Sequence, residues 1–72
     1  MNGFERCRRE AGLTQEQAAW EMGLKSSSTV SMWETGKTMP KTKLLPRIAE
    51  TYGCSIDALF PERSLLKQEQ KD

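Results

Sequence analysis

Residues 25–37, KSSSTVSMWETGK, combine a run of hydroxyl-bearing residues with a tryptophan, a glutamate and a glycine. A serine-rich run on its own is typical of a flexible linker. Serine and threonine also favour the starts of helices, because their hydroxyls accept hydrogen bonds from free backbone amides. We therefore expect Ser26 or Ser27 to cap a helix that ends at Gly36. Its inward-facing apolar pair would be Val30 and Trp33.

A second helix is predicted immediately before this stretch, in residues 13–23, LTQEQAAWEMG. Thr14 and Gln17 have the spacing of a capping box, and Gly23 is a stop signal. Its inner face would carry Gln15, Ala18, Ala19 and Met22. A capped helix that begins three or four residues after a glycine-terminated helix is a helix-turn-helix.

Three further short helices complete an all-α prediction. The first would start at Asn2, with Glu5 in capping-box spacing, and end at Gly12. The fourth must begin near Lys43, because proline at position 46 is tolerated only in a first turn, and the fifth would be capped by Ser55. The inward residues of these three helices are predicted to be Phe4, Cys7, Arg8, Ala11, Leu44, Leu45, Ile48, Ala49, Tyr52, Ile56, Leu59 and Phe60. No alternating apolar pattern of useful length predicts a strand.

The length and composition limit the classes of protein to which the chain can belong. Its 72 residues suffice for one small domain, which we place at residues 2–61, followed by a polar tail, 62–72, that is either helical or disordered. No apolar run is long enough to span a bilayer, and the N-terminal residues do not resemble a signal peptide. We therefore expect a cytoplasmic protein with no membrane partner.

Catalysis and metal binding are not expected. The chain has no histidine, no glycine-rich phosphate loop and no paired-carboxylate motif, so we predict that it is not an enzyme. We expect no cofactor, no metal and no small-molecule ligand. Cys7 and Cys54 fit the apolar periodicity and are interpreted as reduced core residues, with a disulfide or a metal pair as the alternative.

The formal net charge of +1 conceals a local basic segment. Residues 36–47 contain four basic side chains and no acidic one: Lys37, Lys41, Lys43 and Arg47. Such a segment can meet a polyanion while the rest of the chain stays neutral. The alternative is a solvated loop and helix face.

Several of these motifs together resemble the Cro/C1-type helix-turn-helix domain of phage and bacterial repressors. The resemblance is carried by LTQEQAAWEMG at 13–23, VSMWETGK at 30–37, Pro40, and LLPRIAETYGCSIDALF at 44–60, and covers roughly residues 4–60. It implies a compact five-helix, lambda-repressor-like DNA-binding fold, with the helix-turn-helix at helices 2 and 3. It also implies double-stranded DNA as partner, with residues Ser27–Thr35 as the recognition helix in the major groove.

The resemblance also implies roles for individual residues. Arg8 and Glu34 match a charged pair that ties helix 1 to the end of helix 3, the alternative being two unrelated surface charges. Base-reading positions would be Gln15, Ser27, Ser28, Thr29, Ser31 and Met32. Backbone contacts would come from Thr14, Lys25, Lys37, Thr38, Lys41 and Lys43.

Two features depart from the usual pattern of that family. The recognition helix carries serine and threonine, whose hydroxyls discriminate weakly between bases, and the turn near Lys25 holds one residue more than is common. Trp20 falls off the inner face of helix 2. We interpret it either as covered by helix 1 or by Leu65 and Leu66 of the tail, or as a protein contact.

Two functional hypotheses follow. The first is a sequence-specific, repressor-like transcriptional regulator, which would bind a palindromic site as a homodimer through Phe60, Leu65 and Leu66. The second is a helix-turn-helix domain used for protein contact, of antitoxin or anti-repressor type, with weak or no DNA binding. Its support is the acidic helix 2, the hydroxyl-rich recognition face and Trp20.

Overall fold

A computed structural model of the chain describes residues 3–61 and confirms the all-α prediction. The helices are α1 (Gly3–Glu10), α2 (Gln15–Glu21), α3 (Ser27–Thr35), α4 (Leu45–Tyr52) and α5 (Ile56–Leu59), with a 3-10 turn, η1 (Thr42–Leu44), before α4. No strand occurs within the described residues. The predicted tail, with Leu65 and Leu66, lies outside them, as does Asn2, the predicted first cap.

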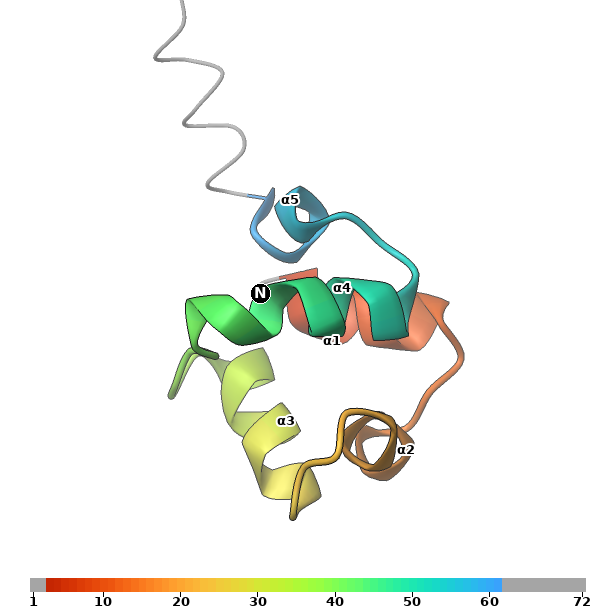
Figure 1. The fold of residues 1–72 in the computed structure, drawn as a ribbon, viewed down its shortest axis with the longest axis vertical. Helices are drawn as coiled ribbons and strands as arrows, with labels where there is room; N and C mark the ends of the chain where they lie inside the picture. Colours follow the sequence, from red (N-terminus) through yellow and green to blue (C-terminus); the bar gives the residue numbers. More distant parts are fainter. Residues whose placement is uncertain (1–2, 62–72) are drawn as a thin grey trace, which may run out of the picture.

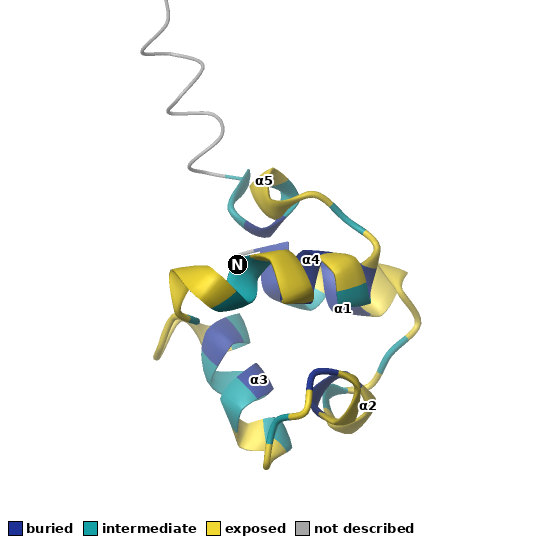
Figure 2. Cartoon of the chain, viewed as in Figure 1, coloured by how far each residue is buried: buried dark blue, intermediate teal, exposed yellow. Residues whose placement is uncertain are grey.

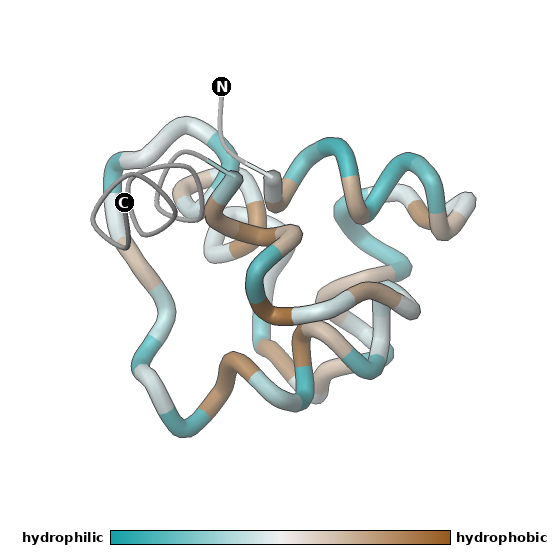
Figure 3. The backbone as a smooth tube through the Cα atoms, turned by 90° about the horizontal axis from the view of Figure 1, so that it is seen from above, coloured by the Kyte–Doolittle hydropathy of each residue, from teal (hydrophilic) through white to brown (hydrophobic). Residues whose placement is uncertain are grey.

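The helices are arranged around α1 and α4, which cross the middle of the molecule (Figure 1). The short helix α5 packs against both of them on one side, and α2 and α3 pack against each other on the opposite side. Figure 3 shows hydrophobic residues interspersed with hydrophilic ones along the helices, as expected for helices that each have one face in a shared core. Within the helix-turn-helix pair, α3 is the helix that packs most against α1.

The starts of the helices are set by local hydrogen bonds that the sequence predicts. In α2, Thr14 Oγ1 accepts from the Gln17 amide at 3.0 Å, and Gln17 Oε1 accepts from the Thr14 amide at 2.9 Å. Ser26 is the cap of α3, accepting from the Ser28 amide at 2.9 Å. Each of the four glycines that follow α1, α2, α3 and α4 has a positive φ, a conformation that side chains rarely adopt.

The core is one cluster to which every α-helix contributes (Figure 2). Its buried apolar residues are Phe4, Cys7, Ala18, Ala19, Met22, Val30, Trp33, Ile48, Ala49, Tyr52 and Leu59. The Phe4 ring lies 6.1 Å from that of Trp33 and 5.3 Å, edge-on, from that of Phe60. Phe4 thus joins α1 to α3 and to the end of α5, and each such ring stabilises the fold by about 1.5–3 kcal/mol through burial.

Two predicted core positions are wrong. Ala11 is exposed because α1 ends at Glu10, so the chain has already left the helix when it reaches this residue. Ile56 is 40% exposed because it is the first residue of a four-residue helix, and such a helix can bury only one narrow side. Leu59 occupies the buried side of α5 instead. Both cysteines are free: Cys7 is buried and Cys54 is half-buried against the core.

The start of α1 approaches α5 closely, and this approach depends on a glycine. A Cβ atom built on Gly3 would lie 2.0 Å from the backbone oxygen of Ala58. Backbone atoms cannot be displaced as cheaply as the end of a flexible side chain. Gly3 is therefore required by packing, although alanine is the better helix former.

We expect Gly3→Ala to destabilise the protein by about 2 kcal/mol, despite the gain in helix propensity, because α5 must move away from α1. Urea unfolding followed by circular dichroism measures the change. Arg6→Ala is the matched control, since Arg6 is exposed on the same helix, and it should stay within about 0.5 kcal/mol of the parent. A Gly3→Ala protein as stable as the parent would contradict the close approach of α1 and α5.

Tyr52 places a hydroxyl in the core without a hydrogen-bond partner among the described residues. The side chain is 4% exposed, and this burial, with the nearby Glu34 carboxylate, raises the pKa of Tyr52 to about 12 from the ordinary 10.0. Burial and a hydrogen bond with Cys7 raise the pKa of the Cys54 thiol to about 12 from 9.0. Both groups hold their proton more tightly in the folded chain.

The stability contributed by these two groups should be full below about pH 9 and should be lost as the pH rises toward 12. The urea midpoint of the parent is expected to fall across this range. The midpoint of a Tyr52→Phe/Cys54→Ala variant should fall less, and Tyr52→Phe alone should be neutral or stabilising near pH 7, because it removes an unsatisfied hydroxyl. Identical pH profiles for parent and variant would contradict this account.

Candidate nucleic-acid interface

The helix-turn-helix is held on α1 by a buried ion pair. Arg8 Nε lies 2.5 Å from Glu34 Oε2, and Arg8 Nη2 lies 3.1 Å from Glu34 Oε1, so the contact is bidentate. Arg8 Nη1 also donates to the Leu13 carbonyl at 2.8 Å. The two side chains are only 10% and 5% exposed. The hydrogen bond to Glu34 raises the pKa of Arg8, although burial opposes this rise.

Gln15, predicted to read bases, is drawn into the same cluster. Its Nε2 donates to Glu34 Oε1 at 3.0 Å. Because an ionised carboxylate only accepts, the amide nitrogen must face Glu34, and the Gln15 carbonyl oxygen is left for another partner. The half-buried Gln15 is therefore oriented at the start of α2 by a side chain from the end of α3.

Thr14, predicted to offer its amide or hydroxyl to a phosphate, has already used one of these groups. Its backbone amide donates to Gln17, and its Oγ1 accepts from the Gln17 amide. The capping box thus occupies the amide, and the predicted phosphate contact of Thr14 stays a prediction for its hydroxyl. The hydroxyl proton remains available to an acceptor.

The outer face of α3 is narrower than predicted. Only Ser28 of the five predicted base-reading residues on this helix is exposed; Ser27, Thr29, Ser31 and Met32 are half-buried. Helical periodicity places Thr29 on the flank near Trp33, whereas Thr35 shares the outer side with Ser28 and Ser31. Thr35 is exposed, and its hydroxyl donates to the Met32 carbonyl at 3.2 Å. Counting seven residues on from Ser28 would have found it.

The basic segment after α3 is exposed and uncompensated. Its predicted contacts Lys37, Thr38, Lys41 and Lys43 are all exposed, and so is Lys25 in the turn before α3. Arg47 on α4, which the sequence did not place among the DNA contacts, is exposed as well. Among residues 3–61 the ion pairs involve Arg8 and Arg9 only. These cations therefore have no carboxylate partner in the described part of the chain. The sequence did hold a signal for Arg47 as a DNA contact, because it follows the predicted contact Lys43 by four residues, the spacing of neighbours on one helix face.

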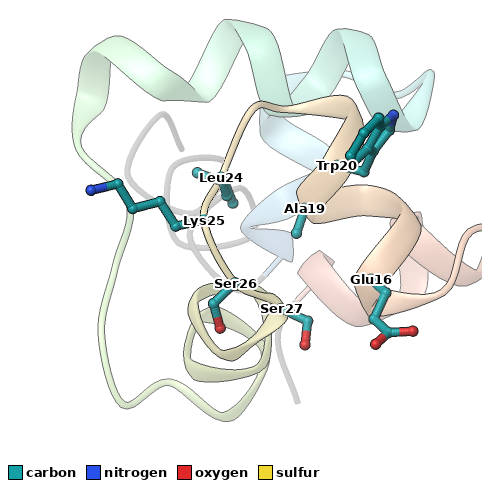
Figure 4. A pocket seen from close by; sticks show the side chains of 7 residues that line it. All are labelled: Glu16, Ala19, Trp20, Leu24, Lys25, Ser26 and Ser27. Carbon is teal, nitrogen blue, oxygen red and sulfur yellow. The ribbon is translucent and has the colours of Figure 1, made fainter.

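Trp20 is 84% exposed, so the interpretation that helix 1 covers it is wrong. It lines an open hollow of about 370 Å³ between α2 and the start of α3 (Figure 4). The tail leucines of the alternative interpretation lie outside the described residues. Phe60, a predicted dimer contact, is half-buried against Phe4.

Neither a metal centre nor a membrane span is found in the part of the chain that the structure describes. No three His, Cys, Asp or Glu side chains come together as a candidate metal site within residues 3–61. None of the helices there is long and apolar enough to cross a membrane.

Comparison with known families agrees with this architecture. A family model described as helix-turn-helix matches residues 4–59, a range that contains α2 and α3 and reaches from α1 to α5. The chain belongs to the Cro/C1-type helix-turn-helix family. Membership places this helix-turn-helix protein among DNA-binding regulators, a class that is typically non-enzymatic. No curated protein and no solved structure matches the chain.

In this helix-turn-helix protein, Arg8→Ala should destabilise the fold by about 3–5 kcal/mol, because it leaves the Glu34 carboxylate buried without a cation. Replacing both residues, as Arg8→Met/Glu34→Met, should cost far less and serves as the matched control. Thermal unfolding of the parent, of Arg8→Met, of Glu34→Met and of the double variant gives the coupling energy. Additive effects of the single variants would show that the pair is energetically unimportant.

Proposed function

We propose that the protein is a sequence-specific DNA-binding transcriptional regulator of repressor-like type, with α3 in the major groove. The observation that supports this most is the juxtaposition of a hydroxyl-bearing outer face on α3 with exposed, unpaired cations in the segment that follows it. When unpaired lysines neutralise phosphates, the counterions condensed on the DNA are released, and this release drives binding to the duplex. The α3 face would then be held against base edges.

In this proposal the cations and the hydroxyls have different tasks. Lys37, Lys41 and Lys43, with Arg47 as a further contact, would neutralise phosphates and set the register of the domain on the duplex. Ser28 and Ser31 would donate to or accept from base edges, and Met32 would contact a thymine methyl group. Because hydroxyls discriminate weakly, DNA shape and bridging water would supply part of the sequence preference.

A homodimer on a two-fold symmetric site is part of the proposal. A single domain of this size offers a small interface with DNA, and pairing two half-sites increases the affinity. The predicted dimer contact uses Phe60 with Leu65 and Leu66 of the tail. Phe60 is half-buried and packs against Phe4, so a dimer contact here would lie next to the core at the end of α5.

A second candidate function is protein contact with weak or no DNA binding, as in an antitoxin or an anti-repressor partner. The specific observation in its favour is the 84% exposed Trp20 on a helix that carries glutamates and no cation. The two candidates differ in their dependence on salt, because only DNA binding releases counterions in proportion to the phosphates contacted.

The direct test is the selection of bound duplexes from a random pool at low salt. We expect enrichment of one motif with two-fold symmetry, since each copy of α3 would read one half-site. A motif without symmetry would contradict the dimer. If no sequence is enriched, sequence-specific regulation is excluded and the protein-contact function is favoured.

Replacing two of the basic residues should flatten the salt dependence of duplex binding. Lys37→Ala/Lys41→Ala removes two phosphate contacts and should lower the slope of log affinity against log salt by about 1.8 per domain. Fluorescence anisotropy with a labelled duplex measures this slope. Arg6→Ala on α1 removes one exposed cation outside the segment and should leave the slope unchanged; equal slopes for all three proteins would contradict the proposed interface.

A further inference from the structure

Trp20 is the most exposed large hydrophobic side chain among residues 3–61. At 84% exposure the indole contributes little to the core, and the inner face of α2 is already filled by Ala18 and Ala19. Exposed aromatic side chains beside a concave surface are common anchors of protein interfaces. Folding alone therefore does not account for a tryptophan at this position.

The surface beside Trp20 is concave. The hollow of about 370 Å³ has Ala19 and Leu24 as apolar lining, and Ser26 and Ser27 border it at the start of α3 (Figure 4). Its residues come from two helices and the turn between them. The hydrogen bond by which Ser26 caps α3 fixes the side of the hollow that α3 forms. The hollow can receive a side chain of a partner next to the indole.

The charge around the indole is negative. Glu16 lies one helical turn before Trp20 and lines the same hollow, and Glu21 follows Trp20 directly. No hydrogen bond or ion pair within residues 3–61 engages either carboxylate. The cation that lines the hollow, Lys25, extends away from Trp20 in Figure 4. A cation over the indole face is therefore favoured both by the ring and by the two neighbouring carboxylates.

We infer that this hollow binds a cationic segment of a protein partner, with an arginine beside an apolar residue. The guanidinium would stack on Trp20 and donate to the Glu16 carboxylate, and the apolar residue would cover Ala19 and Leu24. Arginine suits this site better than lysine, because its planar group stacks and forms two parallel hydrogen bonds. Lys25 and Ser27, which the sequence predicts as DNA contacts, border the same hollow. The inference rests on Trp20 and Glu16, which are not among the predicted DNA contacts.

The experiment selects displayed random peptides of about 12 residues on the purified full chain, without DNA. We expect enriched peptides to carry arginine within one or two positions of an apolar residue. A synthetic peptide of the enriched sequence should bind about tenfold more weakly to Trp20→Ala and to Glu16→Gln. Met39→Ala and Glu50→Gln are matched controls, since both residues are exposed away from the hollow, and they should bind like the parent.

Three results would overturn the inference: no enrichment, enrichment of acidic or neutral peptides, or enriched peptides that bind Trp20→Ala as well as the parent. Thermal unfolding verifies that the variants fold. If Trp20→Ala does not fold, the binding of the peptide to Glu16→Gln is the test. Duplex binding by Trp20→Ala should equal that of the parent. If Trp20→Ala lost duplex binding, Trp20 would belong to the DNA-binding surface and the peptide-binding inference would fail. The proposed regulator function would not fail with it, so the two failures can be told apart.

Discussion

The arrangement of this domain depends on the ion pair between Arg8 and Glu34. A carboxylate in the last turn of a helix is disfavoured by the helix dipole, and this one is also almost fully buried, so it requires a cation. Arg8 supplies that cation from α1 and binds the Leu13 carbonyl with the remaining side of its guanidinium. Glu34 in turn orients Gln15. One cluster thus sets the positions of α1, the start of α2 and the end of α3.

Most of the fold could be predicted from the sequence because its signals are local. A capping box needs only Thr14 and Gln17, and both of its hydrogen bonds are formed between residues three apart. The glycines that end four of the helices act through their own φ angles. Helical periodicity then separated Ala18 and Ala19 from the exposed Trp20 without any knowledge of neighbouring helices.

What the sequence could not predict depends on how the helices meet. The need for glycine at position 3 arises from Ala58, which is distant in sequence. Ile56 looked apolar enough for the core, but the side of α5 that packs is decided by α1 and α4. The candidate site divides in the same way: the basic segment and the capping box are visible in the sequence, whereas the hydrogen bond that turns the Gln15 side chain toward Glu34 joins two helices and required their assembly.

The central claim is that the outer face of α3 and the basic segment after it form one DNA-binding surface. Amide chemical-shift mapping of the ¹⁵N-labelled full chain with a mixed-sequence duplex of about 20 base pairs at low salt tests this claim most directly. We predict that the largest shifts fall at Ser28, Thr35 and Lys37–Lys43, with the Gln15 side-chain amide among them. Shifts concentrated around Trp20 and α5, or no shifts at any duplex concentration, would contradict the claim.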